Sequence, residues 1–293
     1  MSRVRLLAPA KINLGLAILG KRDDGYHEID SVMAMVGLYD ELVFAETPEP
    51  GITIVGMDDV PMEQNLIYKA TQLWLTETRT NRGVNIQVTK HIPSPGGLGG
   101  GSTDAAATLI ALEHLFQVRH TNTPSLAASI GADCPFFLSS SPANRARGIG
   151  TDLDVAPVPK GWSVLITPTV DMAAKTSRLY GALTPEDYGT PGQMDEVVAR
   201  LEKDELPEIN LLANSFDRAV NALMPGVAQL RETLGDAGIE VALSGAGPTL
   251  YALASEEKTA RSIASRARML VDDSTAIHVA PFLATVPTPE DLR

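Results

Sequence analysis

Hydrophobic and polar residues alternate along the first part of the chain in the pattern of a β-strand. Between Arg5 and Leu19, apolar residues at positions 12, 14, 16 and 18 alternate with Lys11, Asn13 and small residues. This period of two predicts a half-buried strand in which Lys11 and Asn13 share one face. A turn is predicted at Asp23-Asp24-Gly25. Further strands of an antiparallel sheet are predicted for the apolar runs 32–38, 42–44 and 52–55.

A helical period replaces the alternation at residues 65–75, where Leu66, Ala70 and Leu73 lie on one side. Residues 84–89 alternate strictly and predict a strand. This strand leads through Lys90 into a glycine-rich segment, after which residues 105–116 carry leucines at helical spacing. The predicted order is therefore strand, glycine loop, helix.

Signals for helices and strands continue through the second half of the chain. Thr123 is expected to be the N-cap, with Pro124 at the first helical position, of a short helix that ends near Gly131. The pattern assigns no element to residues 184–194. The other expected elements are strands at 163–167, 241–243, 249–254 and near Ile277, and helices at 210–223, 226–237 and 256–270.

Strands mixed with helices in both halves predict the α+β class. A chain of 293 residues exceeds the size at which single cores usually stop growing, so two domains are expected. Residues 155–161 contain two prolines and a glycine that interrupt both periods, which marks a boundary. We expect an N-terminal domain at residues 1–156 and a C-terminal domain at 157–293, with the option that the last strand returns to the first domain.

The charge balance limits the class of partner. The formal net charge of −12 argues against a broad surface for nucleic acid or anionic lipid, so an anionic ligand must be held locally. The single cysteine, Cys134, cannot form an intramolecular disulfide, and no apolar run approaches the ~20 residues of a membrane span. We expect a cytoplasmic monomer or weak homodimer with no nucleic-acid or membrane partner.

The segment from Gly96 to Gly101 carries the clearest binding chemistry. Its five glycines let successive backbone N–H groups converge on an oxyanion, and the following helix adds its positive dipole end. The segment is not a Walker A motif, because no Gly-Lys-Ser/Thr follows, and Ser102 occupies the third glycine position of a dinucleotide fingerprint. A flexible linker is the alternative, but a linker rarely lies between a clear strand and a clear helix. The context favours phosphate binding.

A bound polyphosphate also needs Mg²⁺, which takes hydroxyl and carboxylate oxygens as ligands. Ser102, Thr103 and Asp104 follow the glycine loop and are the nearby candidates. The same residues could instead cap the start of the helix. For Asp104 alone, the two interpretations are equally supported.

Four separated segments of the chain resemble the GHMP small-molecule kinases. These segments are residues 8–14 with 24–29, 93–106, 131–137 and 243–249, and they occur in the expected order. The resemblance implies a two-domain GHMP kinase fold. Its N-terminal, ATP-binding domain would be similar to domain 2 of ribosomal protein S5, and its C-terminal domain would be ferredoxin-like. ATP and the acceptor would then bind in the cleft between the domains.

The triplet Gly25-Tyr26-His27 resembles the family members that act on a cytidine diphosphate-linked methylerythritol. For this chain, the resemblance implies transfer of the γ-phosphoryl group of ATP to the 2-hydroxyl of that substrate, a step of non-mevalonate isoprenoid precursor biosynthesis. Asp133 would accept the hydroxyl proton. Lys11 would lie between Asp133 and the reacting oxygens, where an ammonium keeps the carboxylate ionised and stabilises charge on the transferring group.

The resemblance also implies binding roles. Tyr26 and Tyr180 would stack on the cytosine, His27 would bond to its edge and Thr176 would lie near the diphosphate. Asn13 and Gly245 would also contact the acceptor, and Ser102 is the possible Mg²⁺ ligand. The residues implied to hold ATP are Asn65, Leu66, Pro93, Ser94, Pro95, Gly96, Gly97, Leu98, Gly99, Gly100, Gly101, Ser102 and Thr103.

Structural interpretations exist for several of these residues. Lys11 could be a surface lysine at a strand edge, Asn65 a helix N-cap, and Tyr26 with His27 an exposed loop pair. Two other functions also stay open. Another GHMP kinase, acting on homoserine, mevalonate or a sugar, would share the loop without the Gly25-Tyr26-His27 triplet. A nucleotide-binding regulator would bind ATP without turnover, but the presence of both Lys11 and Asp133 argues against it.

Overall fold

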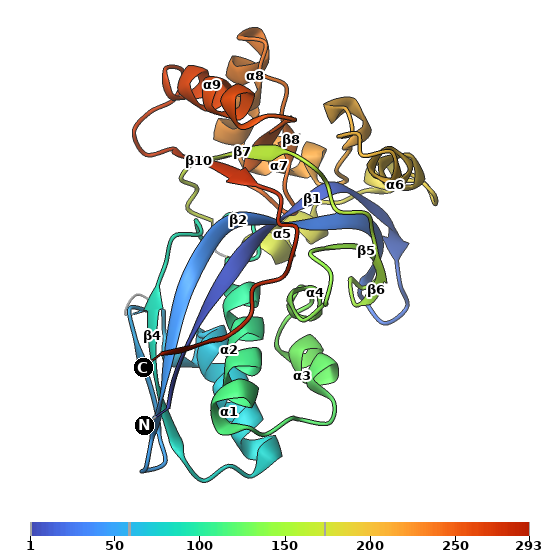
Figure 1. Cartoon of the computed structure of the whole chain (residues 1–293). Coiled ribbons are helices and arrows are strands. Elements are labelled where there is room, and N and C mark those ends of the chain that lie inside the picture. The colour runs from blue at the N-terminus through green and yellow to red at the C-terminus, as the bar shows by residue number, and fades with distance from the viewer. Residues whose placement is uncertain (1, 58–59, 173, 293) are drawn as a thin grey trace.

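The computed structural model describes residues 2–57, 60–172 and 174–292, which form two β-sheets flanked by helices (Figure 1). The larger sheet has seven strands and the smaller has four. The larger sheet contains β1 (Arg3–Lys21), β2 (His27–Thr47), β3 (Ile52–Val55), β4 (Gly83–Thr89), β5 (Ala143–Gly148), β6 (Asp152–Val155) and β11 (Glu290–Leu292). The smaller sheet contains β7 (Trp162–Thr167), β8 (Ala242–Leu243), β9 (Leu250–Ala254) and β10 (Ala276–Pro281), in the order β10-β7-β9-β8.

Helices from the first half of the chain pack together on one side of the larger sheet (Figure 1). They are α1 (Leu66–Thr78), α2 (Gly100–Phe116), α3 (Thr123–Ile130) and α4 (Cys134–Phe137). The second half contributes α5 (Lys175–Gly181), α6 (Asp195–Glu202), α7 (Asp217–Leu223), α8 (Pro225–Asp236) and α9 (Glu257–Arg268). Across residues 2–57, 60–172 and 174–292, no helix has the length and apolar character to cross a membrane.

Strand β1 runs through three hydrophobic clusters and connects the two halves of the molecule. Leu6 packs with α1 and α2, Ile12 packs against the smaller sheet, and Ile18 belongs to the cluster around Phe216. The strand and the turn before β2 are confirmed, but its half-buried character is wrong, because every residue from Ala8 to Ile18 is buried. Residues from the second half of the chain cover the face of β1 that the sequence pattern predicted to be exposed to solvent.

The order of strand, glycine loop and helix is confirmed, but α2 begins at Gly100 and not at residue 105. Gly99 precedes it with a φ of 75°, a left-handed conformation that glycine adopts without strain. The chain therefore turns into the helix inside the loop. As a result, the free N–H groups of the first helical turn belong to the glycine segment itself.

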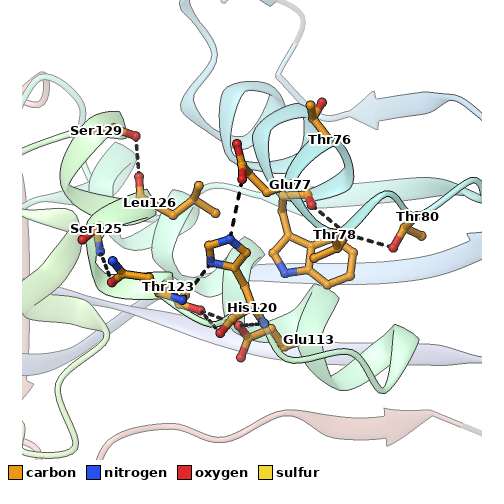
Figure 2. Close-up of polar contacts among 12 residues, drawn as sticks. Thr76, Glu77, Thr78, Thr80, Glu113, His120, Thr123, Ser125, Leu126 and Ser129 are labelled. Carbon is orange, nitrogen blue, oxygen red and sulfur yellow. Dashed lines mark hydrogen bonds and ion pairs between the residues drawn. The ribbon is translucent and has the colours of Figure 1, made fainter.

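The start of α3 differs by one residue from the prediction. Asn122 is the N-cap, and its side-chain oxygen accepts a bond from the Ser125 N–H at 3.3 Å. Thr123 is already helical, and its hydroxyl donates to Glu113 on α2 at 2.5 Å, as Figure 2 shows. Pro124 is therefore the second helical residue and not the first, as was expected. Polar contacts thus connect the end of α2 to the start of α3.

The helix predicted for residues 210–223 is wrong over its first half. A short 3-10 turn occupies Ile209–Leu211, and α7 begins only at Asp217. Between them the backbone pairs with β1: the Leu16 N–H donates to Ala213 at 2.9 Å, and the Ser215 N–H donates to Leu16 at 2.8 Å. Backbone groups that bond to a strand cannot also complete a helix.

Two further corrections concern the sheets. β3 pairs with β4 in parallel, so the sheet is not wholly antiparallel. The strand near Ile277 is not the last, because β11 follows it and pairs with β1.

The segment at 184–194 contains a 3-10 turn at Pro185–Asp187. The runs 32–38 and 42–44, predicted as separate strands, form one strand, β2. The other predicted strands and helices are confirmed to within a few residues, whereas β5, β6, α4, α5 and α6 were not predicted. The change from one sheet to the other falls between Val155 and Trp162, while the domain ranges 1–156 and 157–293 stay a prediction.

Asn214 is expected to contribute strongly to stability. Its side chain donates to the carbonyls of Leu243 and Gly245 and accepts from the Phe216 N–H, all in a buried position. Asn214→Ala leaves these groups without partners, so we expect a loss of roughly 2–4 kcal/mol in the free energy of urea unfolding. Asn210→Ala, at an exposed position of the same segment, is the control. Equal stability of the two variants would contradict this role.

Candidate functional site

The glycine loop packs directly against a second glycine turn, at residues 245–247. Gly97 has a φ of 81°, and a Cβ there would lie 2.4 Å from the Ser244 carbonyl oxygen. The Ser244 hydroxyl donates to the Gly97 carbonyl at 3.1 Å, and the Thr249 N–H donates to the Gly96 carbonyl at 3.2 Å. The shape of the loop therefore depends on residues from the second half of the chain.

Lys11 is buried beside this loop and held by a chain of hydrogen bonds. Its backbone N–H donates to the Leu98 carbonyl at 2.9 Å, and its side chain is only 4% exposed. The ammonium Nζ donates to Asn13 Oδ1 at 2.5 Å, and Asn13 Nδ2 donates to Ser31 Oγ at 2.8 Å. Lys11 and Asn13 share one face of β1, as predicted, and the interpretation of Lys11 as a surface lysine is wrong.

Asp133 lies next to Lys11, although more than a hundred positions separate them in the sequence. The carboxylate Oδ2 is 3.4 Å from the Lys11 Nζ, and the Asp133 side chain is 39% exposed. Asp133 directly precedes α4, at the end of the connection from α3. One buried cation and one accessible carboxylate thus face the same space.

These residues line a cavity of about 470 Å³, called here the central cavity. Both halves of the chain contribute to its wall. Among the predicted site residues, its lining includes Lys11, Asn13, Leu66, Ser94, Pro95, Gly96, Gly97, Gly99, Gly100, Gly101, Ser102, Asp133, Thr176, Tyr180 and Gly245. The structure therefore brings most of the predicted site together.

A second cavity of about 630 Å³, the side cavity, adjoins the first and shares Leu66, Ser94 and Gly101 with it. Its other lining residues are Gly56, Met57, Val60, Gln64, Asn65, Ile67, Lys90, Ile92 and Asp104. Asn65 is also the N-cap of α1, because its Oδ1 accepts from the Ile67 N–H at 2.9 Å. This residue therefore fits its structural interpretation and lines a cavity as well.

Five predicted site residues line neither cavity. Leu98 is a core residue, Thr103 is buried in the first turn of α2, and Pro93 precedes the loop. Tyr26 is 62% exposed. His27 stacks on Tyr180 with 4.7 Å between ring centroids, so only the histidine of this pair contacts the wall of the central cavity. Thr103 Oγ1 has no hydrogen-bond partner among the described residues.

Sequence reasoning missed a buried ionic cluster under the side cavity. The Lys90 ammonium donates to Asp104 at 2.6 Å and also to Asp40, which accepts the backbone N–H groups of His91 and Ile92. Burial raises the pKa of Asp104 to about 7. The charge of Lys90 opposes this rise, but Lys90 is shared with Asp40, whose own charge favours the protonated form of Asp104. Lys90 thus binds one oxygen of Asp104. The sequence around Asp40 contains no pattern that indicates its contact with Lys90.

Lys175 is a second cation in the central cavity that the sequence did not single out. It is 8% exposed, and its ammonium donates to the Gly247 carbonyl in the second glycine turn. Burial, together with the nearby charge of Lys11, lowers the pKa of Lys175 to about 8. Its position next to Thr176 in the sequence was the only available signal.

The described residues hold no group of three or more His, Cys, Asp or Glu side chains that could bind a metal by themselves. The hydroxyl of Ser102 and the carboxylate of Asp133 nevertheless line the central cavity together. Oxygen groups of this kind fit Mg²⁺, which usually takes most of its ligands from water and substrate phosphates.

Comparison with known proteins shows the family of this chain. The description "GHMP kinases N terminal domain" matches residues 65–141, and "GHMP kinases C terminal" matches residues 198–270. A curated relative from Pelotomaculum thermopropionicum is 35% identical over 90% of this chain and 94% of its own length, and is named 4-diphosphocytidyl-2-C-methyl-D-erythritol kinase. The chain belongs to the GHMP kinase family. A Macrococcus caseolyticus relative of the same name is 35% identical over 87% of the chain and 92% of its own length.

Solved structures also match this GHMP kinase. A crystal structure of 4-(cytidine 5'-diphospho)-2C-methyl-D-erythritol kinase matches with a TM-score of 0.80 and 32% identity, covering 94% of this chain and 99% of the other. A homoserine kinase from Cytophaga hutchinsonii matches with a TM-score of 0.75 at 20% identity, covering 99% of this chain and 97% of the other, which shows a shared fold. The predicted α+β GHMP kinase fold is confirmed.

Two glycines of the loop are expected to differ sharply in their tolerance of a side chain. Gly97→Ala combines a positive φ with a clash against the Ser244 carbonyl, so we expect a loss of about 2 kcal/mol or more in unfolding free energy. At Gly101 the nearest atom to a Cβ is Leu66 Cδ1 at 3.5 Å, and Gly101→Ala should change stability by less than about 1 kcal/mol. Urea unfolding of the ligand-free variants measures both. A stable Gly97→Ala protein would show that the loop is not locked to the second turn.

Proposed function

We propose that this GHMP kinase transfers the γ-phosphoryl group of ATP to the 2-hydroxyl of 4-diphosphocytidyl-2-C-methyl-D-erythritol. The contact between Lys11 and Asp133, at 3.4 Å beside the glycine loop, carries the proposal. This contact puts a cation and an accessible carboxylate where an alcohol can meet a phosphoryl group. The names of the relatives support the acceptor.

ATP is proposed to span the two adjoining cavities. The adenine fits the side cavity, next to Asn65 and Leu66, and the phosphates follow the loop through the shared residues Ser94 and Gly101. There the free N–H groups and positive dipole end of α2 face the phosphates. The γ-phosphoryl group then enters the central cavity. Pro93, Leu98 and Thr103 support the loop from behind.

The acceptor is proposed to enter the central cavity from the side of α5. Tyr180 offers a flat ring for the cytosine, and its stack with His27 places the imidazole near the edge of a bound base. Tyr26 precedes His27 and is exposed, so it is available to cover the other face of the base. Asn13, Thr176 and Gly245 line the path from there to Lys11.

In the proposed reaction, Asp133 accepts the proton of the 2-hydroxyl as its oxygen bonds to the γ-phosphorus. The bond from that phosphorus to the bridging oxygen breaks, and ADP leaves with the electron pair. Lys11, held by Asn13, stabilises the negative charge on the transferring group. Mg²⁺, held mainly by the phosphates with Ser102 as a protein ligand, supplies further neutralisation of phosphate charge when bound.

Residues from both halves of the chain line the central cavity, and a monomer or weak homodimer is proposed as the working form. The one cysteine, Cys134, is buried, and this fits the proposed cytoplasmic location. Burial raises the pKa of the Cys134 thiol to about 12, so it does not compete as a nucleophile.

Asp133→Asn tests the proposed base. An amide cannot accept the proton, so we expect kcat to fall roughly 10²- to 10⁴-fold, while ATP binding is kept because the nucleotide contacts lie elsewhere. Steady-state kinetics with Mg-ATP and the cytidine diphosphate-linked acceptor measure kcat, and calorimetry measures nucleotide binding. Asp152→Asn, at an exposed position on β6, should keep the original activity. An unchanged kcat in Asp133→Asn would rule out the assigned role.

Tyr180→Ala tests the site of the base. Loss of a stacking ring is expected to raise KM for the acceptor roughly 5- to 100-fold, with little change in KM for ATP. Tyr180→Phe keeps the ring and should behave like the original protein. Because Tyr180 also packs on Phe216 at 4.9 Å, thermal melting must accompany the kinetics. Equal increases in both KM values would count against stacking on the cytosine.

A further inference from the structure

Lys175 occupies a buried position on the acceptor side of the central cavity. It is the first residue of α5, the helix that also carries Thr176 and Tyr180. Its side chain lines the cavity together with Lys11 and Asp133, and its ammonium donates to the Gly247 carbonyl. The proposed roles of Lys11 and Asp133 in the reaction leave Lys175 without an assignment.

The cations of the central cavity outnumber its anions. Lys11 and Lys175 line the cavity, but Asp133 is the one carboxylate among the described lining residues. Asp133 and Asn13 contact the Lys11 ammonium, whereas the Lys175 ammonium donates a hydrogen bond to the Gly247 carbonyl. An ammonium has three N–H donors, so Lys175 keeps donors for a ligand. Because a buried charge is costly without compensation, an anionic ligand would stabilise this arrangement.

The position of Lys175 along α5 indicates which anion it meets. Tyr180 marks the proposed base end of the acceptor, and the Lys11–Asp133 contact marks the alcohol end. At a helical rise of 1.5 Å per residue, Lys175 lies about 7.5 Å along the axis from Tyr180, a distance that a nucleotide covers from its base to its phosphates. The diphosphate of the acceptor joins its base to its alcohol and must pass between these two ends.

We propose that Lys175 binds the diphosphate of the acceptor and makes the enzyme selective for a nucleoside diphosphate-linked alcohol. The inference rests on the proposed function for the identity of the acceptor. The phosphates of ATP share the same chemistry and lie across the cavity along the glycine loop. Binding to ATP instead of to the acceptor is therefore the outcome that an experiment must separate.

The test compares CDP with cytidine as ligands of the intact protein, by calorimetry. Lys175→Met removes the charge at similar volume, Lys175→Arg keeps it, and Lys258→Met, at an exposed position on α9, is the control. In the unmodified protein CDP should bind more tightly than cytidine. We expect Lys175→Met to weaken CDP binding about tenfold or more with little effect on cytidine, and Lys175→Arg to retain much of the preference. In kinetics, KM for the acceptor should rise while KM for ATP stays within about twofold.

A pH series provides a second readout that a purely structural role would not move. The pKa of Lys175 is lowered to about 8, so the free protein loses this charge as pH rises from 7.5 to 9. The titratable groups that line the cavity with it are Lys11, Asp133 and Tyr180, and burial raises the pKa of Tyr180 to about 12, outside this window. CDP binding should therefore weaken toward pH 9 in the unmodified protein and less so in Lys175→Arg, whose guanidinium stays charged.

Several results would overturn the assignment. Equal weakening of CDP and cytidine, or a rise in KM for ATP with KM for the acceptor unchanged, would exclude a contact with the acceptor diphosphate. If Lys175→Met melts before the binding measurement, the pH series and Lys175→Arg still decide the question. If the unmodified protein does not phosphorylate the cytidine diphosphate-linked acceptor, the proposed function fails. The comparison of CDP with cytidine needs no turnover and would still report on Lys175.

Discussion

The hydrogen bond from the Lys11 backbone to the Leu98 carbonyl is the contact on which the site depends. This bond fixes β1 to the glycine loop. Lys11 therefore sets both the position of its own buried ammonium and the path of the loop backbone that is proposed to bind phosphate. A lysine this deeply buried is stable only with partners, and Asn13 and Asp133 supply them. The geometry of the proposed catalytic pair therefore follows from satisfying one buried charge.

The second constraint is the contact between the two glycine turns. Gly97 approaches the other turn so closely that a Cβ on Gly97 would lie 2.4 Å from the Ser244 carbonyl oxygen and 2.9 Å from the backbone of Gly247. The loop comes from the first half of the chain and the turn from the second. Their packing means that both halves of the chain shape the central cavity. A change in the core of the second half can therefore alter the proposed phosphate site without altering any residue of that site.

Much of the fold was predictable because local patterns determine it. The alternation in β1 placed Lys11 and Asn13 on one face, and the strand, glycine loop and helix followed from spacing and turn chemistry. The role proposed for Asp133 could not be inferred from its sequence neighbours and came only from the family resemblance. Features set by distant segments were missed for a physical reason: residues 213–215 pair with Leu16 across the molecule, and Asp40 meets Lys90 only after folding. The start of α2 was missed because helix signals in glycine-rich segments are weak.

The pairing of β11 with β1 carries a consequence for biosynthesis. In that pairing Arg5 lies opposite Glu290, so β1 pairs with a segment that is synthesised 285 residues after it. Until residues 290–292 emerge, the outer edge of β1 near Val4 presents backbone groups to any extended peptide nearby. During translation the nascent chain thus exposes an unpaired strand edge, which β11 covers in the folded enzyme.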